Sequence, residues 1–341
     1  MINDFAQEQI YYIKKKCKVI KPLVAIHCIT FNHEQYLKYA LDGFLMQKTN
    51  FPFVVIVHDD ASLDNTAHVL KKYVEKYPDL IFPIYENENQ FVKGKNAYGE
   101  ILKIMNAAID STGAKYIAYC EGDDYWIDPF KLQKQVDFLE NNPEYGMVYG
   151  IAKTWVQSKN TFSKNLGIKY TSVKDILSVP YQIPASTILY RRDFYQEVYD
   201  KYLKTNNWLM VDYPLTLGLA SESKIYFIPD EMSVYRILEE SACHIKDYEK
   251  LVRFKESAFE VSKFFAQVNN IPLQEINLDN NYNSELFKIS RENNKLKKAF
   301  YYYKKIKPLN KKERLYHNIS FSLPTFLLLQ YLFKLKTNFH K

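Results

Sequence analysis

The chain has 341 residues, of which 47% are hydrophobic and 25% are charged, a composition that excludes a disordered or fibrous protein and supplies a sizeable core. Its net charge is +7, but the excess of Lys and Arg lies between residues 288 and 314, so the front of the chain is close to neutral. The 4 cysteines form no C-x-x-C pair, which disfavours a zinc knuckle or a disulfide framework. The polar start lacks the apolar segment of a signal peptide, so we expect a cytoplasmic protein.

Four short apolar runs in the first third of the chain predict strands that are buried on both faces: 23–30, 53–58, 80–85 and 116–120. Three segments between them carry apolar residues at helical spacing: 37–45, 70–77 and 96–111. Strands that alternate with helices of this length indicate βαβ units, a parallel sheet and right-handed crossovers. Ligands of such sheets bind beyond the carboxyl ends of the strands.

After the fourth strand the pattern changes. Residues 128–144 predict an amphipathic helix opened by Asp-Pro, and residues 146–156 predict a strand that need not be parallel to the first four. Residues 161–235 mix short strands and helices and would complete the same domain. Residues 246–316 read as helical, polar and increasingly basic. The apolar segment 321–335 is too short, and too interrupted by a proline and a glutamine, to predict a membrane span.

Two acidic clusters follow strands of the predicted sheet. Asp59 and Asp60 end the second strand, and Glu121, Asp123 and Asp124 follow the fourth. Strand ends on one edge lie close together, so we expect these carboxylates to face one crevice, where they repel each other unless a cation or hydrogen-bond donors compensate. Mg²⁺ or Mn²⁺, held by one or two carboxylates and by substrate phosphates, is the usual solution. The alternative is that they are turn residues and helix caps.

The order of three segments, which carry "TFN", "VHDD" and "EGDD", resembles the family 2 glycosyltransferases. The segments are 22–47, 53–70 and 114–140, and the resemblance covers roughly residues 20–240. Members of that family are inverting enzymes of the GT-A fold. The resemblance implies an α/β fold, with a Rossmann-like, mostly parallel sheet flanked by helices. We therefore expect a GT-A catalytic domain over residues 20–245 and a basic, helical C-terminal extension over 246–341.

The activity that the resemblance implies is transfer of a sugar from a nucleotide-diphosphate donor, with Mn²⁺ or Mg²⁺ as cofactor. An acceptor hydroxyl displaces the nucleoside diphosphate directly at the anomeric carbon. We expect a hexosyl- or N-acetylhexosaminyltransferase that acts on a glycan or a lipid-linked glycan in bacterial cell-surface polysaccharide synthesis.

The resemblance places the nucleotide at the first loop and the first acidic cluster. Thr30, Phe31 and Asn32 match the loop where backbone and an aromatic ring meet the nucleobase, although Phe31 alternatively packs beneath that loop. Asp59 and Asp60 match the pair that reads base and ribose. A carboxylate can accept a hydrogen bond from a base N–H, which cytosine does not offer, so UDP- or dTDP-sugars are favoured.

The resemblance places the diphosphate and metal at "EGDD", where Glu121 replaces the first Asp of the family's D-x-D-D. Glu121, Gly122 and Asp124 are expected to bind the donor and Asp123 the metal directly. Lys93, between the third strand and the next helix, either reaches a phosphate or is a solvated surface lysine.

A later motif, Tyr-Arg-x-His in the family, departs from the pattern here. Arg236 is present and is expected to contact phosphate, because its planar fork matches phosphate oxygens. Leu238 stands in place of the histidine, so a metal ligand is missing unless His244 replaces it.

The transfer step needs a general base, because a hydroxyl is a poor nucleophile at neutral pH. Asp212 stands alone in an apolar stretch, where burial would raise its pKa, and it matches the family's late carboxylate. The alternative is that it caps the helix that Pro214 helps to start. Trp208 and Ser186 are the candidates for contact with the acceptor sugar, and core packing is the alternative for Trp208.

The basic C-terminal segment allows two interpretations. In the first it lies on the inner face of the plasma membrane, with Lys and Arg toward anionic head groups; in the second it packs on the domain or on a second copy of the chain. Nucleic-acid binding is disfavoured, since no recognised binding motif accompanies the charge.

Two other function classes were weighed against the transferase. A sugar nucleotidyltransferase is disfavoured, because it should carry a Gly-rich loop after the first strand and the first glycine there is Gly43. A non-catalytic scaffold subunit that binds the sugar nucleotide stays as the alternative, supported by Glu121 and Leu238.

Overall fold

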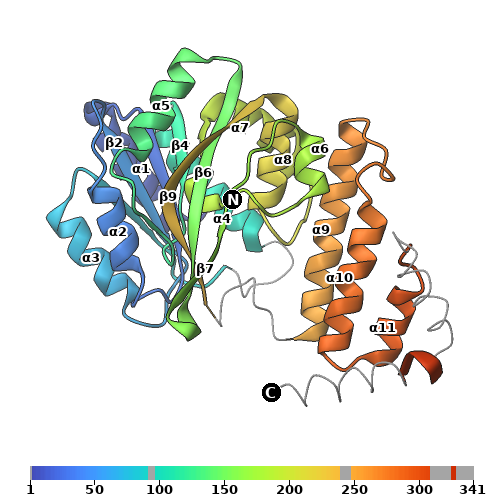
Figure 1. The fold of residues 1–341 in the computed structure, drawn as a ribbon. Helices are drawn as coiled ribbons and strands as arrows, with labels where there is room; N and C mark the ends of the chain where they lie inside the picture. The colour runs from blue at the N-terminus through green and yellow to red at the C-terminus, as the bar shows by residue number, and fades with distance from the viewer. Residues whose placement is uncertain (1, 91–96, 239–246, 308–323, 328–341) are drawn as a thin grey trace. The chain divides into compact units, whose positions relative to one another are not determined.

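The protein divides into two compact units, residues 1–241 (unit 1) and 242–341 (unit 2). The computed structural model describes residues 2–90, 97–238, 247–307 and 324–327. Unit 1 is built on one nine-stranded sheet, and the described part of unit 2 is helical (Figure 1).

The first half of the sheet is parallel and has the strand order β3-β2-β1-β4. Its strands are β1 (Val24–Thr30), β2 (Phe53–Asp59), β3 (Ile81–Tyr85) and β4 (Tyr116–Tyr119). The connecting helices are α2 (Leu37–Leu45), α3 (Thr66–Lys76) and α4 (Ala97–Thr112). All seven elements were predicted from the apolar pattern. The register pairs Thr30 with Asp59, so the first loop and the first acidic cluster begin side by side.

The second half of the sheet is mixed, with the order β4-β8-β6-β9-β5 and β7 paired to β6. Its strands are β5 (Tyr125–Trp126), β6 (Tyr145–Val156), β7 (Thr161–Leu166), β8 (Leu189–Arg191) and β9 (Lys224–Ile237). Helices α5 (Lys131–Asn141), α6 (Val173–Ser178), α7 (Arg192–Val198) and α8 (Asp212–Glu222) accompany them, with short helical turns η1 (Gln157–Lys159), η2 (Ala185–Thr187) and η3 (Tyr199–Leu203). The α/β fold is confirmed, with a parallel core that a mixed half extends.

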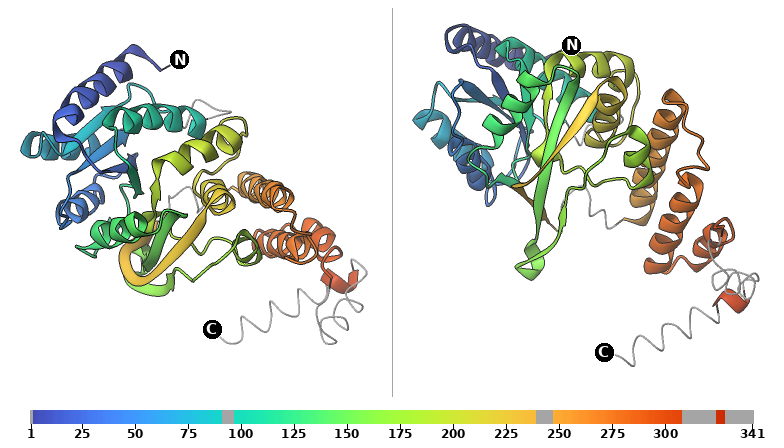
Figure 2. Two further views of the ribbon diagram at one scale, coloured as in Figure 1. Left: turned by 90° about the horizontal axis from the view of Figure 1, so that it is seen from above. Right: turned by 45° about the horizontal axis from the view of Figure 1, so that its top comes forward.

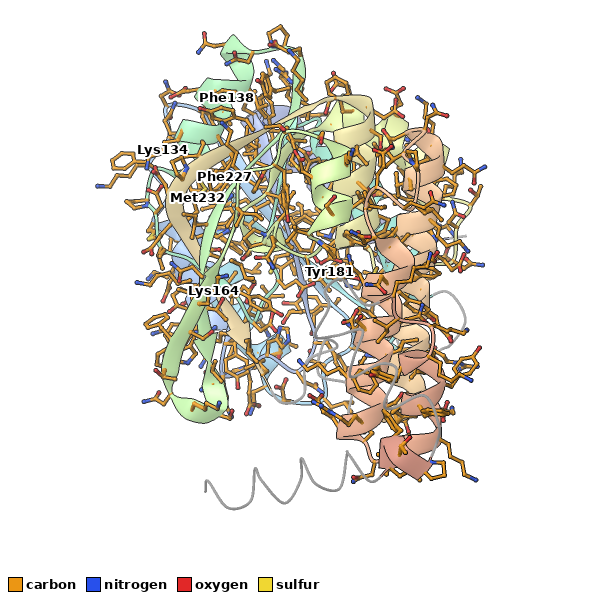
Figure 3. All side chains as sticks on the ribbon, turned by 45° about the vertical axis from the view of Figure 1, so that its right-hand side comes forward. Lys134, Phe138, Lys164, Tyr181, Phe227 and Met232 are labelled. Atoms are coloured by element: carbon orange, nitrogen blue, oxygen red, sulfur yellow. The ribbon has the colours of Figure 1, made fainter. Side chains whose placement is uncertain are left out.

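The long strands β6 and β9 run parallel and in contact, which brings the end of β9 to the acidic clusters. Met232, labelled on β9 in Figure 3, is fully buried against Gly150 of β6. A Cβ at position 150 would lie 2.6 Å from the Met232 sulfur, closer than van der Waals contact permits. Glycine at this position therefore lets the strand pair close without displacing the buried Met232 side chain.

Helix α1 (Asp4–Ile20) precedes the predicted domain and was not predicted. It packs against β3 and α4 (Figure 2, left). Only three of its residues are buried, Ala6, Ile13 and Cys17, and they form a narrow stripe on a largely polar helix. Because the apolar stripe is so thin, hydrophobic periodicity gave little sign of the helix.

Unit 2 contains α9 (Tyr248–Val268), α10 (Leu278–Glu292) and α11 (Leu296–Tyr303), in the region predicted to be helical. Asp247 caps α9 by accepting from the Lys250 amide. Tyr248, Val252, Leu286 and Ile289 form its apolar cluster. Most of the apolar segment 321–335 lies outside the described residues, and among those described no helix is long and apolar enough to cross a membrane.

The core of unit 1 contains one fully buried lysine. Lys131, at the start of α5, donates from Nζ to Gln135 Oε1 at 2.8 Å, and its Nζ lies 4.2 Å from the Trp126 ring centroid. Burial disfavours the charged form and lowers the pKa of Lys131 to about 7.

The lowered pKa of Lys131 predicts a pH-dependent stability. From about pH 7 to pH 10 the unfolded chain binds more protons than the folded chain, so the free energy of unfolding rises with pH there, by at most about 1.4 kcal/mol per unit from this group. Lys131→Met removes this contribution. In urea denaturation, the free energy of unfolding of the wild type, relative to that of the variant, should be higher at about pH 9 than at about pH 7. A difference that stays constant would contradict a buried, titrating Lys131.

Candidate functional site

Both acidic clusters join the carboxyl end of β1. The Asp60 amide donates to the Thr30 carbonyl at 3.1 Å, and the Gly122 amide donates to the Ile29 carbonyl at 2.9 Å. The structure thus brings the segment after β2 and the segment after β4 to the same edge of the sheet, on either side of β1.

The first acidic cluster is buried and fixed by hydrogen bonds. Asp59 and Asp60 are each 2% exposed. Asp59 Oδ1 accepts from the Ser62 hydroxyl and amide, and burial raises the pKa of Asp59 against these hydrogen bonds. Asp60 Oδ1 accepts from the Gln90 amide at 2.7 Å.

The first loop, with Thr30, Phe31 and Asn32, lies against the same segment. Asn32 has φ 54°, and it is tied on both sides, because its amide donates to Ser62 Oγ at 2.9 Å and its Oδ1 accepts from the Leu63 amide at 2.8 Å. Phe31 is half-buried, and Thr30 is fully buried.

The second acidic cluster is crowded. Asp123 and Asp124 are 8% and 5% exposed, and burial raises the pKa of both carboxyls. Asp124 Oδ1 accepts from the Arg236 amide at 2.8 Å. Glu121 keeps an exposed surface, and its Oε1 accepts from the Tyr119 hydroxyl at 2.7 Å. Backbone hydrogen bonds and the charge of Arg236 act on the Asp123 carboxyl as well, but its Oδ1 has no partner among the described residues.

Arg236, at the end of β9, is held beneath this cluster. Its Nη1 donates to the Asp123 carbonyl at 2.5 Å. The rings of Tyr36, Tyr39 and Tyr125 surround the guanidinium, with centroids at 5.2, 4.8 and 4.6 Å from Cζ. Arg236, the predicted phosphate contact, therefore lies beside Asp123, the predicted metal ligand, and aromatic packing fixes the Arg236 side chain.

Asp212, the predicted base, is the first residue of α8 and is solvent-exposed. Loss of hydration raises its pKa, and hydrogen bonds to the backbone at Tyr213 and Asp212 act against this rise. Loss of hydration and the charges of Asp123 and Asp212 all raise the pKa of Glu121, so Asp212 lies close enough to the second acidic cluster to interact with it electrostatically.

The acceptor candidates lie in two segments. Trp208 is half-buried ahead of α8. Ser186, in η2, is 2% exposed, and its hydroxyl lies 2.9 Å from that of Ser233 and hydrogen-bonds Asp124. These contacts give Ser186 a role in holding Asp124, while its role toward an acceptor stays a prediction.

His33, just after the predicted "TFN" loop, is a site residue that the sequence reasoning missed. Its Nε2 lies 4.0 Å from Asp123 Oδ2, and burial lowers its pKa to about 4. In the sequence His33 directly follows the predicted loop, but a lone histidine has no spacing pattern that would mark it as a site residue.

Three of the buried polar atoms that lack a hydrogen-bond partner within the described part of the chain belong to this site: Thr30 Oγ1, His33 Nδ1 and Asp123 Oδ1. The first two lie beside Gly122, the residue before Asp123, because an added Cβ there would lie 2.8 Å from Thr30 Oγ1 and 3.1 Å from His33 Nδ1. Buried polar groups normally find partners, so this point is suited to a ligand or water.

These residues fit a hard divalent cation. Asp123 offers a carboxylate oxygen that is buried and without a partner, and Mg²⁺ and Mn²⁺ prefer oxygen ligands. Among the described residues no group of three or more His, Cys, Asp or Glu side chains is placed to hold a metal. Substrate phosphates and water would have to complete the coordination.

Two candidates, Lys93 and His244, lie outside the described residues. Leu238, in the place of the expected histidine, is described and is 8% exposed.

A second unpredicted feature lies near Asp212. Tyr181 has φ 62°, is 40% exposed, and its ring centroid is 4.7 Å from that of Tyr213, the residue after Asp212 (Figure 3). A positive φ is uncommon for a bulky residue and carries strain.

The sequence model of glycosyl transferase family 2 matches residues 26–199, just over half of the chain. The chain belongs to this family. The matched range includes both acidic clusters, the first loop and Ser186, and it ends before Asp212 and Arg236.

Relatives of this family 2 chain are similar to it over 62–63% of its length. Uncharacterised proteins of Mycobacterium tuberculosis and Mycobacterium bovis are 34% identical over 215 residues, which is 62% of this chain and 58% of theirs. An uncharacterised glycosyltransferase of Nostoc is 25% identical and covers 63% of this chain and 64% of its own length. The chain thus spans less than two thirds of these relatives.

Among solved structures, Staphylococcus aureus TarS 1–349 in complex with UDP is similar in fold, with a TM-score of 0.56, 16% identity, and coverage of 92% of this chain and 91% of that one. This likeness agrees with the predicted GT-A fold, a mixed sheet flanked by helices with further helices at the C-terminal side.

The position of Gly122 generates a prediction. Gly122→Ala places a Cβ against Thr30 and His33, so it should cost about 1–3 kcal/mol of stability and weaken binding of a nucleoside diphosphate. Gly113→Ala is the matched control, because φ 72° makes it strained, by about 1 kcal/mol, while no atom lies within 4 Å of the added Cβ. Denaturation and nucleotide titration check both. Equal nucleotide affinity in the two variants would contradict a ligand site at Gly122.

Proposed function

We propose that this family 2 chain is an inverting, metal-dependent glycosyltransferase with a UDP- or dTDP-sugar donor. The observation that carries the proposal is the convergence at the end of β1 of two acidic clusters, one of which contains Asp123 with a buried oxygen that lacks a partner among the described residues. Asp212, at the start of α8, interacts electrostatically with Glu121 of the same cluster. Such a set suits a substrate that brings its own cation and phosphates.

The nucleotide would lie over the first loop. The Phe31 ring is available to stack on the base, and Asp59 and Asp60 to accept from a base N–H and from ribose hydroxyls. The solved structures of S. aureus TarS with UDP and with UDP-GlcNAc support a uridine donor and place N-acetylhexosamine in the panel of sugars to test.

The diphosphate would lie between Asp123 and Arg236. Asp123 would hold Mn²⁺ or Mg²⁺, which supplies Lewis-acid stabilisation of the negative charge on the leaving diphosphate. Gly122, the residue before Asp123, packs directly against Thr30 and His33, each of which has an unpartnered polar atom there among the described residues. Arg236, fixed by three tyrosines, adds positive charge beside the cluster.

The transfer would use Asp212 as general base. Its carboxylate accepts the proton of the acceptor hydroxyl as the oxygen bonds to the anomeric carbon, and the bond from that carbon to the diphosphate breaks with its electron pair on the leaving oxygen. The raised pKa of Asp212 brings its basicity closer to what this step needs.

The acceptor would be a glycan or a lipid-linked glycan in bacterial cell-surface polysaccharide synthesis. Trp208, and the exposed ring of Tyr181 beside Tyr213, are the aromatic surfaces suited to a sugar ring. For the membrane contact proposed for the basic C-terminus, the Lys and Arg side chains between residues 288 and 307 are described, whereas most of the apolar segment 321–335 lies outside the described part. The alternative, a scaffold that binds the sugar nucleotide without turnover, shares the donor site and differs only in transfer.

Donor binding is tested by thermal-shift titration with UDP, dTDP, GDP and CMP, each with and without Mn²⁺. UDP or dTDP should raise the midpoint in a metal-dependent manner, since a ligand that binds only the folded state stabilises it. Asp123→Asn should lose the metal-dependent part of the shift. No shift with any nucleotide, while the protein is folded, would contradict the proposed function.

Transfer is tested by Asp212→Asn. If Asp212 is the base, kcat falls by at least about 100-fold while UDP affinity is unchanged, because the donor site is intact. Asp110→Asn is the control, since burial raises the pKa of Asp110 too but the residue pairs with Arg192 at the end of α4. Normal turnover in Asp212→Asn would reject the base. Binding without turnover in the wild type, across the acceptor panel, would favour the scaffold.

A further inference from the structure

A buried carboxylate outside the assigned site lies directly behind the first acidic cluster. Glu86 follows β3, is 7% exposed, and has partners from three segments. Its Oε1 lies 3.4 Å from His58 Nε2, and its Oε2 accepts from Asn3 Nδ2 at 3.3 Å and from Gln90 Nε2 at 3.2 Å. Its amide also donates to the Asp59 carbonyl at 3.0 Å. A carboxylate is costly to bury, so this set of donors is needed to keep it there.

The partners of Glu86 lead to Asp60. Gln90, whose side chain is held by Glu86, donates its backbone amide to Asp60 Oδ1 at 2.7 Å. The next residue back, Asn89, donates from Nδ2 to the Asp60 carbonyl at 3.1 Å. The position of the Asp60 carboxylate therefore depends on the segment 86–90, and that segment is organised around Glu86.

Helix α1 fixes the other side of this network. Asn3 has two functions, since its Oδ1 caps α1 by accepting from the Ala6 amide at 2.8 Å while its Nδ2 donates to Glu86. Gln9 pairs with the main chain of Tyr85 on edge strand β3, accepting from its amide at 2.8 Å and donating to its carbonyl at 3.1 Å. Helix α1, residues 4–20, lies outside the range 26–199 that the family model matches.

We propose that Asp60 is the carboxylate of the pair that reads the nucleobase, that Glu86 is a positioning residue for it, and that α1 is a positioning element. Through Gln90 they hold that carboxylate in the orientation that accepts a base N–H, and they thereby set both nucleotide affinity and the preference for uracil over cytosine. The inference rests on the proposed function, because it requires that a nucleotide binds at Asp60. It adds that a helix outside the family core determines which base is bound.

The ratio of UDP affinity to CDP affinity separates this positioning role from general stabilisation of the fold. A residue that only stabilises the fold lowers the midpoint of unfolding and leaves the ratio of UDP to CDP affinity unchanged. A residue that orients Asp60 changes that ratio, because CDP lacks the N–H that the carboxylate accepts.

The experiment is calorimetric titration of the full-length protein with UDP and with CDP, both in the presence of Mn²⁺. Glu86→Ala should lower UDP affinity by about tenfold and change CDP affinity little, so the ratio falls. Asn3→Ser tests the same network with less risk of unfolding, because serine keeps the helix cap and removes only the donor to Glu86. It should lower the ratio by about threefold.

Lys16→Ala is the matched control. Lys16 lies on the same helix and pairs with Asp79 at 2.7 Å, away from Glu86, so its loss should leave the ratio unchanged. The inference is overturned if Glu86→Ala and Asn3→Ser keep the wild-type ratio, or if the wild type binds UDP and CDP equally. In the first case the proposed function still stands. If the wild type binds no nucleotide at all, both fall.

Discussion

Burial of several carboxylates at one edge of a parallel sheet is the constraint on which the rest of unit 1 depends. Asp59, Asp60, Asp123 and Asp124 are each less than a tenth exposed, and their charges repel. Each must be compensated nearby or bear the cost of burial. Asp59 and Asp60 are compensated by Ser62 and by the Gln90 amide, and Asp124 by the Arg236 amide. Asp123 Oδ1 has no such partner in the described part of the chain, so this oxygen is available to bind a ligand at the sheet edge.

The donors that satisfy these carboxylates come from distant parts of the chain, which explains why the sheet needs its mixed half. Strand β9 runs parallel to β6 and pairs with β5 in the register Tyr125 to Val234. This pairing places Arg236 two residues further on, where its amide reaches Asp124 and its guanidinium lies over Tyr125. The second half of the sheet thus supplies positive charge to the acidic cluster at the edge of the parallel half.

The sequence predicted the parallel half well, because strands buried on both faces are continuous apolar runs and Asp59 and Glu121 mark their ends. It did not predict α1, whose buried stripe of Ala6, Ile13 and Cys17 is too narrow for periodicity to reveal. The interactions of α1 are polar and long-range, such as Gln9 with the main chain of Tyr85, and local patterns carry no trace of them. His33 was missed for the same reason, since only the fold brings it to Asp123.

His33 cannot supply the charge that the second acidic cluster lacks. Burial lowers its pKa to about 4, so at neutral pH the imidazole is uncharged even though Nε2 lies 4.0 Å from Asp123. Leu238, at the position of the family's histidine, adds no polar group either. Burial is the largest cause of the raised pKa values of Glu121, Asp123 and Asp124, and an excess of negative charge in the cluster raises those of Glu121 and Asp124 further, while the charge of Arg236 lowers the pKa of Asp123. A divalent cation bound with the donor would relieve this excess, so donor and metal should stabilise one another's binding.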